Sequence, residues 1–216
     1  QSQAGLRMLK TGGADQAAIE GVLQTNARVA KRAGDLLARL RGWVSVDAPT
    51  HQLVDVNLCV REIADLNRAE FAGRGVDLRL DLLSTTPVAW ADQIGLEQII
   101  QNLIANARDA SPDNGTVVVA TYADAGCVGF TVSDEGPGIP AELAGRLFEP
   151  FSTSKSHGMG LGLSISRRLI EKFGGQIRVG DRADGRSGVV MTVDLPAVDA
   201  AKPNAADKPD GAALSD

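Results

Sequence analysis

Three polar side chains fall on one face of a helix predicted at residues 93–110. Asn102, Asn106 and Asp109 are spaced i, i+4 and i+7, so they form a stripe beside the apolar face of that helix. An asparagine amide oxygen is a neutral, hard ligand that suits Mg2+, which takes few protein ligands and relies on substrate phosphates. Alone the stripe is a weak signal, because most polar stripes on helices are simply solvated. The apolar face that would anchor the helix consists of Leu96, Ile99, Ile100, Leu103 and Ala107.

A short segment rich in glycine, Asp134-Glu-Gly-Pro-Gly138, directly follows a strand predicted at residues 127–133. Gly136 and Gly138 would let the backbone approach a ligand closely. An aspartate at the end of a strand can accept a hydrogen bond from an exocyclic amine such as that of adenine. The same pattern is also compatible with a tight turn that carries an ordinary surface aspartate.

A second glycine-rich segment, Gly158-Met-Gly-Leu-Gly162, leads directly into a helix predicted at residues 161–173. Backbone N–H groups at glycines, followed by a helix N-terminus, form a site for phosphate. No Gly-Lys-Ser/Thr follows, so the segment is not a Walker A loop, and Leu163 leaves the dinucleotide-binding fingerprint incomplete. The segment therefore indicates phosphate binding only in combination with the other motifs.

Four motifs in a fixed order resemble a known family. The N-box (102–107), the G1 box (134–138), the F-box (147–151) and the G2 box (158–163) match the GHKL ATPase domain, which is shared by DNA gyrase B, the heat-shock chaperone, mismatch-repair ATPases and histidine kinases. The F-box and the short lid after it resemble those of sensor histidine kinases of two-component systems. The resemblance covers about residues 3–196. It implies the Bergerat fold, with ATP and Mg2+ as cofactors.

The resemblance implies roles for the residues of the N-box and the G1 box. Asn106 is the implied Mg2+ ligand, and Asn102 stands where ATP-hydrolysing relatives have a glutamate base. An amide cannot act as a base at neutral pH, which fits a domain that shields ATP from water and passes the γ-phosphate to another group. Asp134 is expected to bind the adenine amine, and Gly136 and Gly138 are expected to shape the floor of the pocket.

The lid and the G2 box are expected to hold the phosphates. Lys155 is the third candidate catalytic residue, because its charge would offset that of the phosphates, and Thr153 and Arg108 are further candidates for this role. Asp109 is a further candidate for nucleotide binding by the resemblance. It departs from the family, in which many histidine kinases have a lysine at this position, which counts against direct phosphate contact, so we expect it to cap the helix or to bridge through water. The segment expected to wrap the phosphates comprises Gly158, Gly160, Leu161 and Gly162.

Neither of the two histidines is expected to accept phosphate. By the resemblance, a histidine kinase first phosphorylates its own histidine, on the first helix of its dimerisation hairpin. His51 lies in a predicted linker, without the acidic neighbour or the helix of such a site, and His157 lies in the glycine loop. Both are expected at the surface, with a phosphate contact by His157 left open. We expect the phosphoacceptor upstream of Gln1, so that the chain binds Mg-ATP, does not phosphorylate itself, and acts on a histidine helix supplied by another molecule.

Residues 16–44 are predicted to form one long amphipathic helix. Its apolar positions recur at spacings of three and four, with only Asn26 polar in the seam. With the end of another helix at 3–10 and a turn at 11–13, it resembles a dimerisation hairpin, so we expect a homodimer through a four-helix bundle. A single-chain bundle packed on the rest of the protein is the alternative. The expected domains are a partial hairpin at 1–46, a linker at 47–52, an ATP-binding catalytic domain at 53–196, and a disordered tail or linker at 197–216.

The elements between the linker and the tail mix paired strands with helices. This order predicts an α+β fold, a two-layer α/β sandwich rather than a doubly wound sheet. Helices are predicted at 57–72, 93–110 and 161–173, and strands near 53–56, 76–82, 88–91, 116–122, 127–133, 176–180 and 189–195.

The composition argues against several classes of protein. The chain has 216 residues, a net charge of −5 and a pI near 5.1, so we expect neither nucleic-acid binding nor direct membrane contact. The sequence contains no run of about 18 apolar residues, so it predicts no membrane span. We therefore expect a cytoplasmic domain, which could be the cytosolic part of a larger soluble or membrane-anchored sensor. Cys59 and Cys127 lack a metal-ligand spacing and are expected to be buried free thiols.

Three hypotheses about function follow. The leading one is the catalytic part of a two-component histidine kinase, from which the phosphate passes to an aspartate of a response regulator. An anti-sigma-type serine kinase on the same fold is an alternative, although the long hairpin counts against it. The third is a nucleotide-binding scaffold without phosphotransfer. Intact Asn106, Asp134 and G2 glycines count against a loss of ATP binding but not against a loss of catalysis.

Overall fold

The computed structural model describes residues 51–124, 126–153 and 159–197. The chain divides into two compact units, Gln1–Val46 and Asp47–Asp216, and all described residues belong to the second. The predicted hairpin, its dimer seam and nearly all of the tail lie outside the described residues. Three residues with predicted or open roles also lie outside them, namely Lys155, His157 and Gly158.

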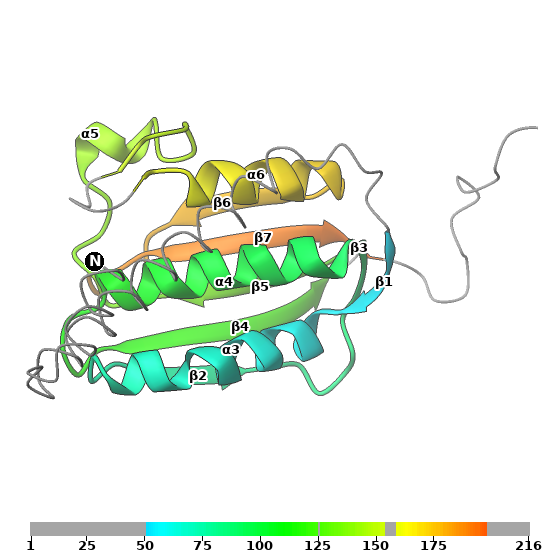
Figure 1. Cartoon of the computed structure of the whole chain (residues 1–216), viewed down its shortest axis with the longest axis horizontal. Coiled ribbons are helices and arrows are strands. Elements are labelled where there is room, and N and C mark those ends of the chain that lie inside the picture. Colours follow the sequence, from blue (N-terminus) through cyan, green and yellow to red (C-terminus); the bar gives the residue numbers. More distant parts are fainter. Residues whose placement is uncertain (1–50, 125, 154–158, 198–216) are drawn as a thin grey trace, which may run out of the picture. The chain divides into compact units, whose positions relative to one another are not determined.

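A mixed five-stranded sheet carries the domain (Figure 1). β2 is parallel to β4, and the other neighbouring strands are antiparallel. The parallel pair needs a crossover, which the chain makes through β3 (Val88–Ala91) and α4 (Gln93–Ala110). The strand order is β2 (Asp77–Asp81), β4 (Thr116–Asp124), β5 (Cys127–Ser133), β7 (Val190–Pro196) and β6 (Gln176–Gly180).

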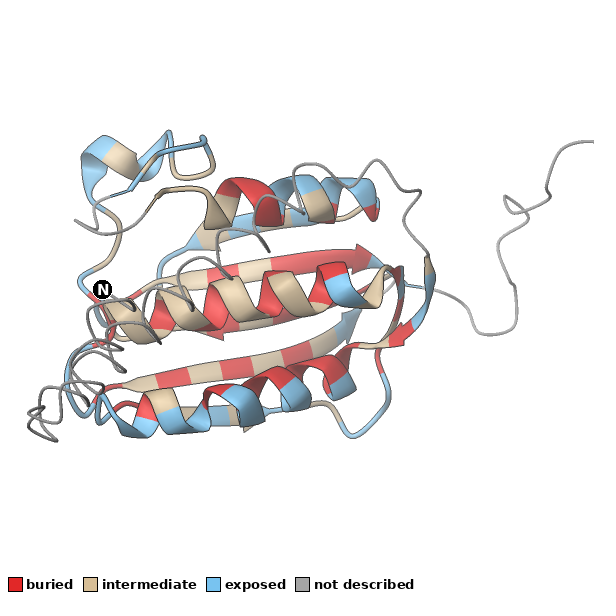
Figure 2. Ribbon diagram, viewed as in Figure 1, coloured by how far each residue is buried: buried red, intermediate tan, exposed pale blue. Residues whose placement is uncertain are grey.

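Helices α3 (Val56–Ala72), α4 and α6 (Gly162–Lys172) cover one face of this sheet (Figure 1). Alternate strand residues point to that face, so Val117 and Val119 of β4 are buried whereas Val118 is only half-buried. The five apolar residues predicted for the core-facing side of α4 are all buried, which confirms that side (Figure 2). The described domain is a two-layer sandwich of helices on a sheet, as the order of elements predicted.

Side-chain caps set the ends of the two long helices. Asp92 Oδ1 accepts a hydrogen bond from the N–H of Gly95 at 2.7 Å, and Asp55 caps α3 in the same way. α4 ends at Ala110 and is followed by its C-cap Ser111, whose Oγ donates to the carbonyl oxygen of Ala107 at 2.8 Å. The caps fix the start and end of α4, and the polar stripe of the N-box occupies its C-terminal half.

A separate two-stranded sheet pairs β1 (Gln52–Asp55) with β3. Beside it, the ring of His51 stacks on Trp90 with centroids 6.4 Å apart and meets Phe173 edge-on at 5.7 Å. His51, which was expected at the surface, is therefore only partly exposed. The ring is half-buried between two aromatic side chains that are distant in the sequence.

Other differences from the predicted elements are small. The bounds agree to within two residues, and the exception is α5 (Ala141–Ala144), a single turn after Pro140 that is too short to show periodicity. Cys59 is buried as predicted. Cys127 is only half-buried, because it begins β5 on the face away from the helices. No helix in the described ranges is both long enough and apolar enough to cross a membrane.

Candidate functional site

Asn102 connects α4 to the first turn of α6. Its Nδ2 donates to the carbonyl oxygen of Gly162 at 3.4 Å and to Ser166 Oγ at 3.3 Å. Gly162 lies so close that a β-carbon there would stand 3.6 Å from Asn102 Oδ1. The N-box therefore meets the start of the helix that follows the G2 box.

The remaining residues of the stripe, Asn106 and Asp109, are half-buried near the C-terminal end of α4. Asp109 accepts from Arg108 at 3.0 Å and from Arg74 at 3.4 Å. Arg108, a candidate for offsetting phosphate charge, also pairs with Glu70, and only 14% of its side chain is exposed. Two carboxylates thus already balance the charge of Arg108, and Asp109 takes part in these ion pairs. Its expected role as a cap or a water-mediated bridge stays a prediction.

Asp134 stands at the end of β5 and is 5% exposed. Its Oδ1 accepts hydrogen bonds from the N–H groups of Gly136 at 2.8 Å and Val189 at 3.2 Å. Both of these bonds end on Oδ1, so Oδ2 is the oxygen to which a ligand could donate. Burial raises the pKa of the Asp134 carboxyl, and the two backbone hydrogen bonds and the charge of Arg182 oppose that rise. An ordinary surface aspartate in a turn does not fit this environment.

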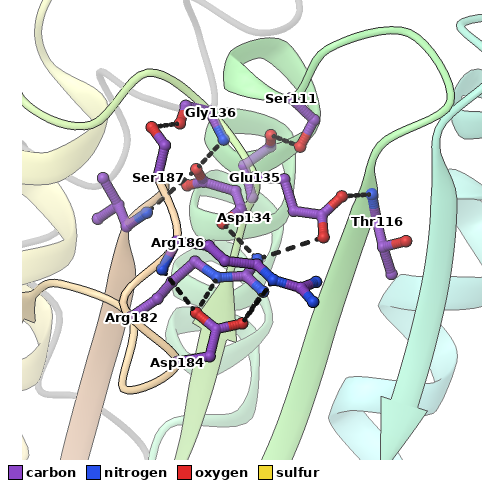
Figure 3. Close-up of polar contacts among 11 residues, drawn as sticks. Ser111, Thr116, Asp134, Glu135, Gly136, Arg182, Asp184, Arg186 and Ser187 are labelled. Atoms are coloured by element: carbon purple, nitrogen blue, oxygen red, sulfur yellow. Dashed lines mark hydrogen bonds and ion pairs between the residues drawn. The ribbon is translucent and has the colours of Figure 1, made fainter.

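The loop between β6 and β7 packs on the turn that follows β5 (Figure 3). Arg182 donates to the carbonyl oxygen of Asp134 at 3.1 Å, and Ser187 Oγ donates to the carbonyl oxygen of Gly136 at 2.7 Å. Gly188 has a φ of 142°, and a β-carbon there would lie 2.1 Å from the Asp134 carbonyl oxygen, so only glycine allows this approach. Sequence reasoning missed these residues, and their local signals were the turn-forming pairs Asp184-Gly185 and Ser187-Gly188.

The two glycines of the G1 box have different surroundings. A β-carbon at Gly136 would lie 2.9 Å from the carbonyl oxygen of Ala110, so the turn passes close to the last residue of α4. Gly138 has a φ of 88°, and a β-carbon there would meet nothing within 4 Å. Gly136 therefore sets the distance between the G1 box and α4, whereas Gly138 borders open space in which a ligand could lie.

Gly160 lies against the backbone of Phe151, the last residue of the F-box. The N–H of Phe151 donates to the carbonyl oxygen of Gly160 at 3.0 Å, which ties the end of the F-box to the G2 box. Gly160 has a φ of 65°, and a β-carbon there would lie 2.5 Å from the Phe151 carbonyl carbon, so the position requires glycine. The next residue, Leu161, is the N-cap of α6, and its carbonyl oxygen accepts from the N–H of Ile165 at 3.0 Å. The first N–H groups of a helix lack partners within it and suit a phosphate ligand.

The F-box also contacts α6. Phe148 packs against the core, and the guanidinium of Arg167 lies 5.8 Å from the centroid of its ring. Phe151 is 72% exposed and Thr153 is exposed. Of the two candidate site residues in the lid, Thr153 lies within the described ranges and Lys155 lies outside them, so the role of Lys155 stays a prediction.

Two motif segments therefore meet the C-terminal half of α4. The G1 box passes its last residue, and α6 contacts it at Asn102. Asn106 lies between these two points, about one helical turn from each. A neutral amide, a buried carboxylate with one available oxygen and a helix N-terminus together suit a purine base carrying phosphates.

A family model described as "Histidine kinase-, DNA gyrase B-, and HSP90-like ATPase" matches residues 91–198, half of the chain. The match contains α4, the G1 box and α6. The chain belongs to this ATPase family.

Relatives narrow the class to sensor histidine kinases. The C4-dicarboxylate transport sensor protein DctB of Rhizobium meliloti is 42% identical over 132 residues, which are 60% of this chain and 21% of DctB. Sensor protein FixL of Bradyrhizobium diazoefficiens is 33% identical over 200 residues, which are 90% of this chain and 39% of FixL. The chain thus spans about a fifth to two fifths of the length of these relatives.

Solved structures agree with this class. The catalytic domain of histidine kinase ThkA has 30% identity and a TM-score of 0.62, and the similarity covers 68% of this chain and 95% of that domain. Full-length ShkA, solved in complex with AMPPNP, has 26% identity and a TM-score of 0.70 over 84% of this chain and 38% of ShkA. The described domain is a catalytic domain of the sensor histidine kinase type.

Proposed function

We propose that this chain is the ATP-binding catalytic part of a two-component sensor histidine kinase, which binds Mg-ATP and transfers the γ-phosphate to a histidine. The observation that carries the proposal is the contact of Asn102 with Gly162 and Ser166. It joins the N-box to the N-terminus of α6, where the helix dipole favours a phosphate group. Membership of the ATPase family and the AMPPNP complex of ShkA support a nucleotide as the ligand.

Asp134 would recognise the adenine base. Its Oδ1 is engaged by two backbone N–H groups, so Oδ2 is available to accept from the exocyclic amine. A hydrogen bond to an ionised acceptor is stronger than one between neutral groups. The open space beside Gly138 would allow the base to lie close to the backbone.

A magnesium ion would be held by oxygen ligands rather than by a cluster of acidic side chains. Within the described ranges, no group of three or more His, Cys, Asp or Glu side chains could hold a metal ion. The amide oxygen of Asn106 together with phosphate oxygens fits the ligand preference of Mg2+. When bound, the ion would neutralise part of the phosphate charge.

The side chain at position 102 favours phosphoryl transfer over hydrolysis. Asn102 stands where a hydrolytic base would be needed, and its amide cannot take a proton from water at neutral pH. A histidine acceptor needs no such base, because the lone pair of a neutral imidazole nitrogen attacks phosphorus directly. The new P–N bond forms while the P–O bond to the departing ADP breaks.

The proposed cycle also requires partners. These are an acceptor histidine, a second copy of the chain joined through the predicted hairpin, and a response regulator that receives the phosphate on an aspartate. ThkA, a structural relative, has been solved in complex with the response regulator protein TrrA. An anti-sigma-type serine kinase is not favoured, because the relatives are sensor histidine kinases.

The proposal is tested by transfer to a second molecule. The chain, incubated with labelled Mg-ATP and a hairpin helix that carries a phosphoacceptor histidine, is expected to label that helix with acid-labile phosphate. The chain alone is expected to stay unlabelled, because neither His51, which packs between Trp90 and Phe173, nor His157, in the glycine loop, is expected to accept phosphate. The control is the same helix with its histidine replaced by alanine. Acid-stable label would indicate a serine kinase, and saturable ATP binding without label would indicate a scaffold.

A further inference from the structure

We propose that Arg182 is a positioning residue that holds Asp134 where it recognises the nucleotide base, and that it thereby sets the preference for adenine. This inference rests on the proposed binding of adenine by Asp134. Arg182 lies outside all four motifs, in the loop between β6 and β7.

The guanidinium of Arg182 is itself fixed in place (Figure 3). Its Nε and Nη2 donate to the two carboxylate oxygens of Asp184 at 3.0 Å and 2.6 Å, a bidentate pair that sets the plane of the group. Only 14% of the side chain is exposed. This geometry leaves Nη1 aimed at the backbone of Asp134, to whose carbonyl oxygen it donates at 3.1 Å.

The backbone and the side chain of Asp134 are both held by the same loop. The N–H of Asp134 donates to the carbonyl oxygen of Val189 at 3.0 Å, and its Oδ1 accepts from the N–H of Val189 at 3.2 Å. With the Arg182 contact, the loop binds the amide, the carbonyl and the carboxylate of one residue. The direction of Oδ2 is therefore set by the loop rather than by the G1 box alone.

Arg182 also pairs with Glu135, the residue next to Asp134. Its Nη1 lies 3.5 Å from Glu135 Oε1, while Glu135 Oε2 accepts from the N–H of Thr116 at 2.9 Å. Glu135 is thus directed toward β4, and Asp134 remains the buried carboxylate of the turn. Without the guanidinium, less positive charge would offset the repulsion between the carboxylates of Asp134 and Glu135. The Asp134 carboxylate would then lose its fixed position.

The base of the nucleotide provides a readout that a purely structural role would not change. Adenine presents an amine that donates to a carboxylate, whereas inosine presents a carbonyl oxygen at that place, which a carboxylate repels. Replacing Arg182 with glutamine is expected to weaken ATP binding about tenfold and to change inosine triphosphate binding little. The ratio of the two affinities should therefore fall about tenfold.

Two further variants and a matched control define the test, which uses the whole chain and Mg2+ in equilibrium titrations. Arg182→Lys keeps the charge and one donor, so the ratio of the affinities for ATP and inosine triphosphate should fall less than in Arg182→Gln. Asp184→Asn keeps Arg182 but weakens its bidentate pair with residue 184, and should lower the ratio by an intermediate amount. The side chain of Asp184 is half-exposed, so this substitution should leave the chain folded and remains informative if Arg182→Gln does not fold. Arg186→Gln removes an equal charge from a 75% exposed side chain of the same loop, and should leave the ratio unchanged.

The outcomes separate this inference from the proposed function. A fall in the ratio for Arg182→Gln and Asp184→Asn, but not for Arg186→Gln, supports the positioning role. Equal losses for both nucleotides, or the same fall in Arg186→Gln, overturn it. If Asp134→Asn leaves the ratio unchanged, the adenine role of Asp134 fails, and this inference fails with it. If Asp134→Asn changes the ratio and Arg182→Gln does not, only the role of Arg182 is overturned.

Discussion

Replacing Asn106 with alanine is expected to lower the rate of phosphoryl transfer from ATP by at least about a hundredfold. The amide oxygen of Asn106 is the proposed protein ligand for Mg2+, on the turn of α4 that follows the contact of Asn102 with Gly162. Alanine would leave the phosphate charge less neutralised and the γ-phosphate less well placed. The measurement is the initial rate at which label passes from Mg-ATP to a separate histidine helix.

The control for Asn106 is an amide on the same helix but far from the site. Gln93 donates to Glu97 at 2.8 Å and lies at the start of α4, about 20 Å along the helix axis from Asn106. Gln93→Ala should keep the transfer rate within about twofold of the unchanged chain. A normal rate for Asn106→Ala at limiting Mg2+ would contradict the proposed metal ligand.

Replacing Asp134 with asparagine is expected to weaken ATP binding about a hundredfold. The amide oxygen of asparagine can still accept from the N–H groups of Gly136 and Val189, so the turn keeps its internal hydrogen bonds. The NH2 group would then replace Oδ2 and face the amine of adenine, donor against donor. The measurement is the dissociation constant for ATP in Mg2+, with Asp77→Asn, on the exposed start of β2, as the control.

The same substitution should not destabilise the nucleotide-free chain. Burial raises the pKa of Asp134, so the folded chain holds this proton more tightly than the unfolded chain does. As pH rises from the unfolded pKa through the folded pKa, the stability contributed by the protonated group is lost, so the ionised carboxylate costs stability above that window. Neutral asparagine avoids this cost. The thermal midpoint of Asp134→Asn at neutral pH should equal or exceed that of the unchanged chain, and a large fall would indicate a structural role instead.

Local patterns in the sequence predicted much of the domain. The spacing of apolar residues predicted the bounds of α4. The five residues predicted for its core-facing side are buried, because a helical repeat of 3.6 residues places them on one face. The glycine-rich segments predicted the turns that meet this helix. Their position relative to the helix follows from close contacts, such as that of Gly136 with Ala110.

Contacts between distant residues were not predictable in this way. Arg182 and Asp134 are 48 residues apart in the sequence, and the loop that joins them in space has no periodicity. Arg108 is a positive charge near the N-box, but its pairing with Glu70 depends on how α3 lies beside α4. His51 likewise gains Trp90 as a neighbour when β1 pairs with β3, and Phe173 from the end of α6.

The most direct test of nucleotide binding is equilibrium dialysis of the intact chain against labelled ATP, with and without Mg2+. Our account predicts saturable binding that strengthens when Mg2+ is added and that unlabelled ATP displaces far better than inosine triphosphate. Failure of the chain to retain ATP saturably in the presence of Mg2+ would contradict it.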